Sequence, residues 1–203
     1  MHPKNIILAI GLAAALVLGA MLALRSQTPA NPEFAQVMPA PVPVPAFSLL
    51  TQHNETVDQS VFEGQWDLVF FGFTHCPDIC PTTMQVLSAA RATLADEGEE
   101  PLPRIVLVSV DPERDTPEAM GQYVDYFGSG NLGLTGTLEE IRKLTTGLGI
   151  YFEKQPGDGD AYVVDHFAGV LLVDPNGGFH ALFRSPHVAA NYVQDLPRLM
   201  GDR

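Results

Sequence analysis

Two short apolar runs limit what this chain of 203 residues can fold into. The stretches "WDLVFFGF" (66–73) and "RIVLVSV" (104–110) are almost continuously apolar and rich in Val, Ile and Phe. Runs of this length and composition are typical of strands that are buried on both faces of a sheet. The segment between them, "TTMQVLSAARATLADEG" (82–98), repeats its apolar residues at helical spacing and ends at Gly98. The sequence therefore predicts a strand, a helix and a second strand in that order.

Two further helices are indicated by the residues at their starts. In "DTPEAMGQYVDYF" (115–127), Thr116 is a suitable N-cap and Pro117 occupies the first helical position. In "TGTLEEIRKLTTGLG" (135–149), Thr137 and Glu140 have the spacing of a capping box, and the glycines near its end stop the helix. Both segments therefore predict helices.

The C-terminal part of the chain predicts a hairpin and a last helix. "YVVDHFAGVLLVDPNGGFHALFR" (162–184) reads as two strands with Asn176 and Gly177 at the turn. Residues 188–200 have helical character, although Pro197 weakens the end of that helix. Alternating strands and helices followed by a hairpin and a helix predict an α/β sandwich with a central mixed sheet.

The N-terminus carries an uncharged apolar run from Ile6 to Leu24. As a helix rising ~1.5 Å per residue, this run comes close to the ~30 Å hydrocarbon core of a bilayer. A cleaved signal peptide is the alternative, but its apolar region is normally ~7 to 15 residues and the following "MLALRSQ" is a poor cleavage site. We expect residues 1–25 to be an uncleaved anchor, one transmembrane helix that precedes the domain.

Charge and composition suggest how the rest of the chain is placed. Lys4 precedes the apolar run, which favours a cytoplasmic N-terminus in the bacterial inner membrane and a domain in the periplasm. Residues 26–46 contain six prolines and predict an extended linker, so the expected globular domain is 47–203. The net charge of −13 argues against nucleic acid as a partner, because phosphates are bound by clustered Lys and Arg.

Both cysteines of the chain lie in "FFGFTHCPDICPTTM" (70–84), between a predicted strand and a predicted helix. Functional groups in α/β folds gather at such carboxyl ends of strands. In a helical turn, Cys76 and Cys80 would share one face, with Cα atoms roughly 6 Å apart, inside the ~4.4–6.8 Å range of disulfides. A redox-active disulfide and a two-thiolate metal site both remain open. An inert structural pair is the third interpretation, though so short a loop would gain little from cross-linking.

A metal site would need a third ligand, and His166 in "YVVDHFAG" is our candidate. Asp165 beside it could orient the imidazole ring. A single histidine on an apolar strand is more often a core residue, so its role stays open at this point. Two thiolates with one imidazole suit Cu(I), or Zn(II) with a fourth ligand. We expect His75 to be structural, and we expect surface positions for the histidines at 53, 180 and 187.

Four blocks of the chain resemble the SCO/SenC family of membrane-anchored copper proteins, in family order. They are "FFGFTHCPDICPTTM", "VSVDPERDTPE" (108–118), "LTGT" (134–137) and "VDHFAGVLLVDPNG" (164–177). The resemblance spans roughly 47–200 and implies a thioredoxin-like fold. It also implies copper, Cu(I) or Cu(II), bound by Cys76, Cys80 and His166.

The function implied by the resemblance is assembly of cytochrome c oxidase. Such a copper chaperone delivers copper to the binuclear copper site of oxidase subunit II; the alternative is a thiol-disulfide oxidoreductase that reduces the cysteines of that site. Other copper chaperones or a thiol reductant would then be further partners. The spacing C-x3-C differs from the C-x2-C of thioredoxins, which favours a metal carrier over an enzyme without deciding the matter. A peroxidase is disfavoured because the second cysteine is too near the first.

Two features depart from or lie outside this pattern. Phe167 stands where the family commonly has Ser after the Asp-His pair, and it could alter access to the site or its outer hydrogen bonds. The acidic residues Asp111, Glu113 and Asp115 follow the second predicted strand. We expect them to form a turn and cap the next helix rather than to bind a hard metal ion.

Overall fold

The computed structural model describes residues 31–157 and 162–201, and residues 32–201 form one compact unit. Its main sheet has eight strands in the order β1-β10-β9-β4-β5-β6-β2-β3. The strands are β1 Ala35–Pro43, β2 Leu49–Thr51, β3 Thr56–Val57, β4 Asp67–Gly72, β5 Arg104–Ser109, β6 Leu132–Thr135, β9 Val170–Val173 and β10 Gly178–Phe183. Strands β4, β5 and β6 are parallel, and the other pairings are antiparallel. The predicted mixed sheet is confirmed.

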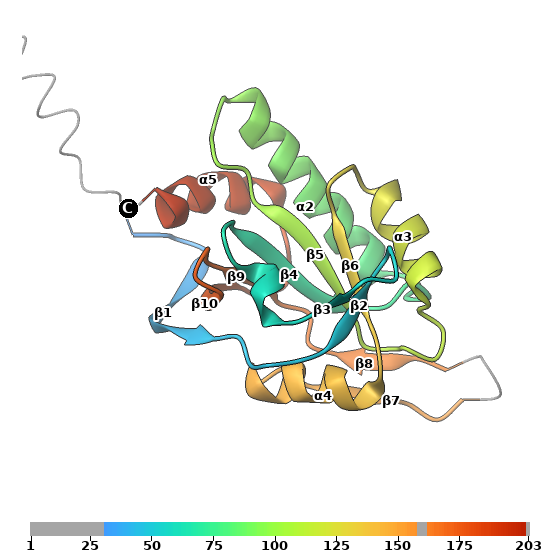
Figure 1. The fold of residues 1–203 in the computed structure, drawn as a ribbon. Coiled ribbons are helices and arrows are strands. Elements are labelled where there is room, and N and C mark those ends of the chain that lie inside the picture. Colours follow the sequence, from blue (N-terminus) through green and yellow to red (C-terminus); the bar gives the residue numbers. More distant parts are fainter. Residues whose placement is uncertain (1–30, 158–161, 202–203) are drawn as a thin grey trace, which may run out of the picture. The chain divides into compact units, whose positions relative to one another are not determined.

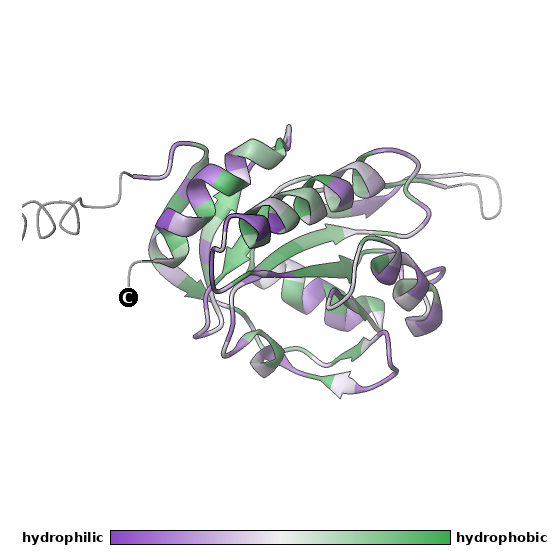
Figure 2. Cartoon of the chain, turned by 90° about the horizontal axis from the view of Figure 1, so that it is seen from above, coloured by the Kyte–Doolittle hydropathy of each residue, from purple (hydrophilic) through white to green (hydrophobic). Residues whose placement is uncertain are grey.

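Four α-helices cover the main sheet. They are α2 Ile79–Asp96, α3 Pro117–Tyr126, α4 Leu138–Gly147 and α5 Ala189–Met200, and a short 3-10 helix spans Gln59–Phe62. Figure 1 shows α2, α3 and α5 on one side of the sheet and α4 on the other. This α/β sandwich follows from the burial of β4, whose six residues are all buried, because a strand that is apolar on both faces needs cover on both sides. Figure 2 shows the hydrophobic strands enclosed between helices whose outer faces are hydrophilic.

The predicted helix starts are confirmed in their main feature. The side chain of Thr116 accepts a hydrogen bond from the backbone N–H of Ala119, and the side chain of Thr137 accepts one from that of Glu140. The carboxylate of Glu140 does not complete a capping box, because it accepts from the backbone N–H of Ser48 at 2.8 Å instead.

A second, two-stranded sheet is formed by β7 (Phe152–Lys154) and β8 (Val164–His166), which pair antiparallel. The sequence predicted that β8 begins a long hairpin ending at residue 184. That part of the prediction is wrong, since the main hairpin consists of β9 and β10 alone. Its turn is where the sequence predicted it, with Gly177 at φ +74° and a hydrogen bond from its N–H to the carbonyl of Asp174.

The proline-rich segment also differs from its prediction as an extended linker. Residues 35–43 form the edge strand β1 and pair with β10, so the folded unit begins before residue 47. Prolines are tolerated there because an edge strand leaves one side of its backbone unpaired, and the pairing is interrupted between Val37 and Val42.

The predicted anchor, residues 1–25, lies outside the described residues. Within the part of the chain that the structure describes, no helix combines the length and apolar character needed to cross a bilayer.

Candidate metal centre

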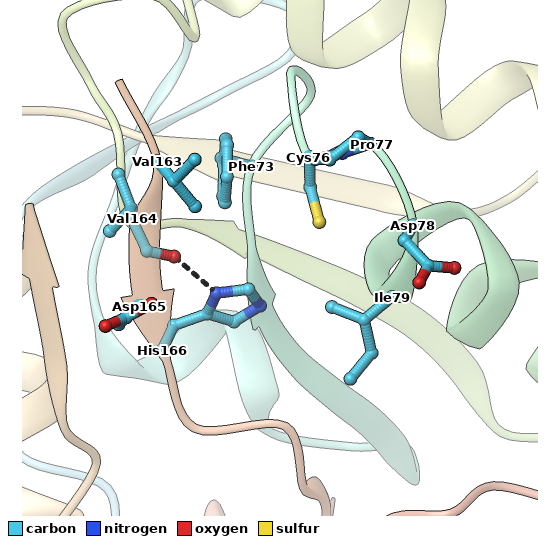
Figure 3. Close-up of a pocket in the computed structure, with 9 residues that line it drawn as sticks. All are labelled: Phe73, Cys76, Pro77, Asp78, Ile79, Val163, Val164, Asp165 and His166. Carbon is cyan, nitrogen blue, oxygen red and sulfur yellow. Dashed lines mark hydrogen bonds between the residues drawn. The ribbon is translucent and has the colours of Figure 1, made fainter. Parts of the chain in front are cut away.

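The cysteine loop, residues 73–78, connects the carboxyl end of β4 to the start of α2 (Figure 3). The N–H of Cys76 donates to the carbonyl of Phe73 at 3.2 Å, and the N–H of Cys80 donates to the Sγ of Cys76 at 3.4 Å. Both cysteines are free thiols. Cys80 is fully buried and Cys76 is 9% exposed, so the latter is the more accessible sulfur.

The imidazole of His166, on β8, lies next to Cys80 in the first turn of α2. Its Nε2 lies 3.5 Å from the Sγ of Cys80, and its Nδ1 lies 2.9 Å from the carbonyl oxygen of Val164. A carbonyl only accepts, so Nδ1 carries the proton and the lone pair of Nε2 is directed at the sulfur. The rings of Phe70 and Phe73 meet the imidazole edge to face at 6.1 and 5.6 Å, which fixes its plane.

The spacing of these donor atoms fits a metal ion. A tetrahedral ion with sulfur at ~2.3 Å and nitrogen at ~2.0 Å holds those two atoms about 3.5 Å apart. The Sγ of Cys80 and the Nε2 of His166 have this separation already. Within residues 31–157 and 162–201, no three His, Cys, Asp or Glu side chains are yet grouped around one point as an ion requires. Completing the site would therefore require a rearrangement among these side chains.

A surface pocket of about 290 Å³ gives access to these groups. Its walls are Phe73, Cys76, Pro77, Asp78, Ile79, Val163, Val164, Asp165 and His166 (Figure 3). The pocket is mostly apolar, with the sulfur of Cys76 and the imidazole facing each other across it. An ion or a partner's side chain could reach the site by this route.

The two thiols differ strongly in acidity. The hydrogen bond donated by the Cys80 thiol, aided by the backbone N–H groups of Asp78 and Cys80 and by His166, lowers the pKa of Cys76 to about 5 in spite of its burial. The same hydrogen bond, together with burial, raises the pKa of Cys80 far above its ordinary value. At neutral pH the pair therefore holds one thiolate, on Cys76, and one thiol.

Asp165 does not orient the imidazole as the sequence suggested. Its carboxylate accepts a hydrogen bond from the side-chain amide of Gln155 at 2.8 Å, on the exposed side of β8. Neighbouring side chains of a strand point to opposite faces, and the carboxylate of Asp165 bonds Gln155 rather than the imidazole of His166. The backbone carbonyl of Val164 takes that role.

Phe167 does not line the pocket. Its ring lies over Gly169, where an added Cβ would come within 2.4 Å of it. The presence of Phe where the family commonly has Ser therefore affects packing around Gly169 more directly than access to the pocket.

The other four histidines that the structure describes do not line the pocket. His53 is exposed, as predicted, and His75 is exposed beside Thr74, with its Nδ1 3.9 Å from Asp115. The surface prediction is wrong for the other two: His180 packs against Trp66, and His187 bonds the carbonyl of Ala168 and the hydroxyl of Tyr192, both at 2.7 Å.

The contacts of the acidic segment, residues 111–115, were not predicted from the sequence. The buried carboxylate of Asp115 bonds Thr74 in the cysteine loop, and Asp111 bonds Tyr162 beside β8. The helix cap after this segment is Thr116 alone. Only the grouping of acidic residues after a strand hinted at such a role.

Comparison with known proteins identifies the family. The family model described as SCO1/SenC matches residues 38–201. The chain belongs to the SCO1/SenC family. This is a family of copper-binding proteins of cytochrome c oxidase assembly. The match includes both cysteines, the acidic segment and His166.

Individual relatives support the assignment. A putative copper-binding protein of Stutzerimonas stutzeri is 33% identical over 164 residues, covering 81% of this chain and 80% of that protein. The mitochondrial SCO2 homologue of Mus musculus is 38% identical over 153 residues; the match covers 75% of this chain but 60% of the longer mouse protein. The copper-bound crystal structure of ScoI from Arabidopsis thaliana has 32% identity and a TM-score of 0.72, covering 77% of this chain and 97% of that one. The thioredoxin-like fold predicted for this chain is confirmed.

Proposed function

We propose that this chain is a copper carrier that binds Cu(I) or Cu(II) through Cys76, Cys80 and His166. The observation that carries the proposal is the 3.5 Å separation between the Sγ of Cys80 and the Nε2 of His166, which suits two ligands of one ion. Two sulfurs and one imidazole form a donor set that favours copper. The sequence similarity to copper-binding members of the family supports the choice of metal.

The site would hold copper as cargo. Cys76 is already a thiolate, Cys80 releases its proton on binding, and His166 offers its Nε2 while its Nδ1 bonds the carbonyl of Val164. With three protein ligands, an acceptor's ligand could enter through the pocket and take over the ion in steps. We propose the binuclear copper site of cytochrome c oxidase subunit II as the acceptor, in line with the assembly role of the family.

We further propose that the chain works at the outer face of a bacterial inner membrane. The support is the uncharged run from Ile6 to Leu24, preceded by Lys4. A protease-protection assay on membrane vesicles would test this topology.

A thiol-disulfide oxidoreductase is the second candidate, favoured by the unequal acidity of the two thiols. The Cys76 thiolate would attack a disulfide of the target, forming a mixed disulfide and releasing one target thiolate. Cys80 would then attack the sulfur of Cys76, releasing the second target thiolate and leaving a disulfide between Cys76 and Cys80. Two electrons pass to the target in this sequence, and an external dithiol would have to restore the pair.

Copper titration of the full chain in detergent, reduced and anaerobic, tests the carrier. We expect one copper per chain with two sulfur ligands and one nitrogen ligand in X-ray absorption, and loss of the nitrogen in His166→Ala. Absence of stoichiometric binding, or a nitrogen signal that persists in the variant, would contradict the proposal. Transfer of electrons to an oxidised oxidase fragment that is unaffected by His166→Ala would favour the oxidoreductase.

A further inference from the structure

The proposed ligands come from two parts of the fold that share no backbone pairing. The cysteines lie on the cysteine loop and α2, next to the main sheet, whereas His166 lies on β8, whose partner is β7. A two-stranded sheet of three residue pairs is barely stable without further contacts. The position of the imidazole relative to the sulfurs must therefore be fixed by side chains.

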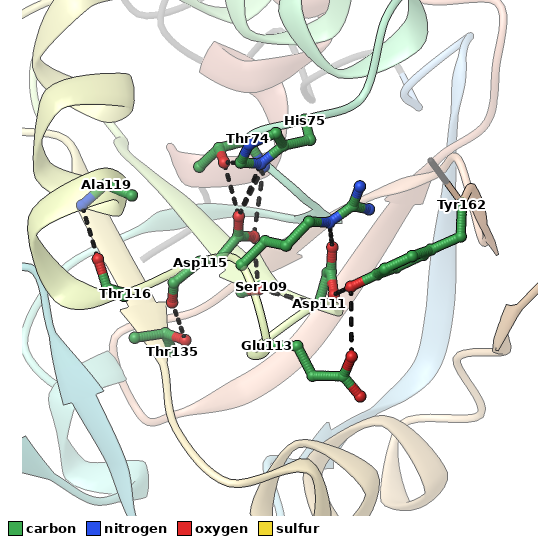
Figure 4. Close-up of polar contacts among 11 residues, drawn as sticks. Thr74, His75, Ser109, Asp111, Glu113, Asp115, Thr116, Ala119, Thr135 and Tyr162 are labelled. Atoms are coloured by element: carbon green, nitrogen blue, oxygen red, sulfur yellow. Dashed lines mark hydrogen bonds and ion pairs between the residues drawn. The ribbon is translucent and has the colours of Figure 1, made fainter. Parts of the chain in front are cut away.

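The acidic segment Asp111–Asp115 contacts both parts (Figure 4). On the side of the histidine, the hydroxyl of Tyr162 donates to the Oδ1 of Asp111 at 2.6 Å and lies 3.5 Å from the Oε2 of Glu113. Tyr162 is 7% exposed and stands two residues before β8. Its hydroxyl therefore ties the start of β8 to the acidic segment by a buried hydrogen bond to a carboxylate, a strong kind of hydrogen bond.

Two cations reinforce this tie. The guanidinium of Arg114 lies 3.7 Å from the centre of the Tyr162 ring and also faces the ring of Phe73 at 5.6 Å. Lys154, at the end of β7, lies 3.8 Å from the Tyr162 ring and bonds the carboxylate of Glu113 at 2.6 Å. Arg114 thus contacts both Tyr162, which precedes β8, and Phe73, which belongs to the cysteine loop. Phe73 in turn contacts the imidazole of His166.

On the side of the cysteines, Asp115 holds the loop. Its fully buried carboxylate accepts from the hydroxyl of Thr74 at 2.6 Å, from the N–H of Thr74 at 3.2 Å and from the hydroxyl of Ser109 at 2.6 Å. Thr74 stands two residues before Cys76. Among the described residues, every hydrogen bond to this carboxylate comes from Thr74 in the cysteine loop or from Ser109 at the end of β5, so its role is to anchor that loop.

We propose that residues 111–115 form a positioning bracket, in which Asp111, Glu113 and Arg114 hold His166 through Tyr162 while Asp115 holds Cys76 through Thr74. The bracket fixes β8 and the cysteine loop relative to one another before any ion arrives. Its residues touch no ligand atom of the site and act only through Tyr162, Thr74 and Phe73. This inference rests on the copper site proposed above.

The histidine side is tested with Tyr162→Phe, which removes one hydroxyl and keeps the ring under Arg114. The matched control is Tyr123→Phe, because the hydroxyl of Tyr123 is buried and makes no hydrogen bond within the described residues. In the full chain in detergent, we expect Tyr162→Phe to weaken copper binding about 10-fold, the low end for the loss of an outer partner of a metal ligand. The nitrogen contribution in X-ray absorption should fall, while the two sulfurs remain and Tyr123→Phe behaves as wild type.

The cysteine side is tested with Thr74→Val, which keeps the shape of the side chain and removes its hydrogen bond to Asp115. The expected result is an altered rate of Cys76 alkylation by iodoacetamide in the metal-free protein, restored in Thr74→Ser. Tyr162→Phe should leave this rate unchanged. A general loss of fold would change both readouts in both variants, so thermal unfolding is recorded for each.

The outcomes separate the bracket from the copper site. If wild type binds no copper, the proposed function fails, and the bracket is then tested by amide exchange in the metal-free protein. There, Tyr162→Phe should speed amide exchange at Phe167, whose N–H bonds the carbonyl of Tyr151 beside the β7–β8 pair. If wild type binds copper and Tyr162→Phe matches Tyr123→Phe in affinity and nitrogen signal, the bracket is refuted while the copper site stands.

Discussion

The fold leaves little room for a side chain at Gly72, next to Cys80. Gly72 ends β4, and a Cβ added there would lie 2.8 Å from the Sγ of Cys80 and 2.8 Å from the Cε1 of Phe70. These separations are about 0.6 Å shorter than an ordinary contact of 3.4 Å. Both neighbours are fully buried, so neither can move into open space. We expect Gly72→Ala to destabilise the fold by about 1–3 kcal/mol, the usual cost of overpacking a core.

For a folded unit of this size, 1 kcal/mol lowers Tm by roughly 2–4 °C, so the loss should be readily measured by thermal unfolding of the metal-free chain. Relief of the clash would also move the sulfur of Cys80 from its 3.5 Å separation from His166, and copper affinity should fall as well. The control is Gly121→Ala in α3, where the nearest atom to the added Cβ is at 3.4 Å and alanine favours the helix. An unchanged Tm and copper affinity in Gly72→Ala would refute the packing argument.

Three further predictions concern the rest of the fold. Burial lowers the pKa of His187, so its imidazole binds a proton more tightly in the unfolded chain than in the folded one. The free energy of unfolding should therefore fall as the pH drops below about 6.5. Urea unfolding of His187→Gln should show a weaker pH dependence than that of wild type. Removing Arg104 leaves the buried carboxylate of Asp67 unpaired, so Arg104→Ala should cost about 3–5 kcal/mol in urea unfolding at pH 7.5. Burial already raises the pKa of Asp67 to about 6, so protonation should make that loss smaller at pH 5, and an equal loss at both pH values would contradict this. Asp195→Ala removes the acceptor of three backbone N–H groups at 33–35; we expect a loss of at least ~1.5 kcal/mol and faster amide exchange in β1, measured by mass spectrometry.

Local patterns predicted the parts of the fold that depend on local physics. Continuous apolar runs gave β4 and β5, and the caps at Thr116 and Thr137 lie where a hydroxyl precedes a helix. The strand at 35–43 was missed because its prolines signal an extended chain, and its pairing with β10 joins residues far apart in sequence.

The sequence predicted the candidate ligand residues but not the hydrogen bonds that position the segments carrying them. The spacing of Cys76 and Cys80 indicated a thiol pair, His166 was the candidate third ligand, and the resemblance supported that choice. The tie between Thr74 and Asp115 spans 41 positions and the one between Asp111 and Tyr162 spans 51, so no local period reveals them. Short polar segments after strands predict turns, and their sequence does not show which distant side chains they bond in the folded protein.

The two parts of the site should also differ in how easily they open. The main-sheet strand β4 is buried throughout, whereas β8 is partly exposed and, within the described part of the chain, pairs with β7 alone. Local opening is favoured where few apolar contacts are buried, so we expect amides of β8 and Phe167 to exchange at a lower free energy than those of β4. Hydrogen exchange of the metal-free chain measures both in one experiment, and equal protection would contradict this picture. If the difference is found, the imidazole is the one of the three proposed ligands that can leave without disturbing the core, and transfer of copper from the proposed site would begin at His166 rather than at the sulfurs.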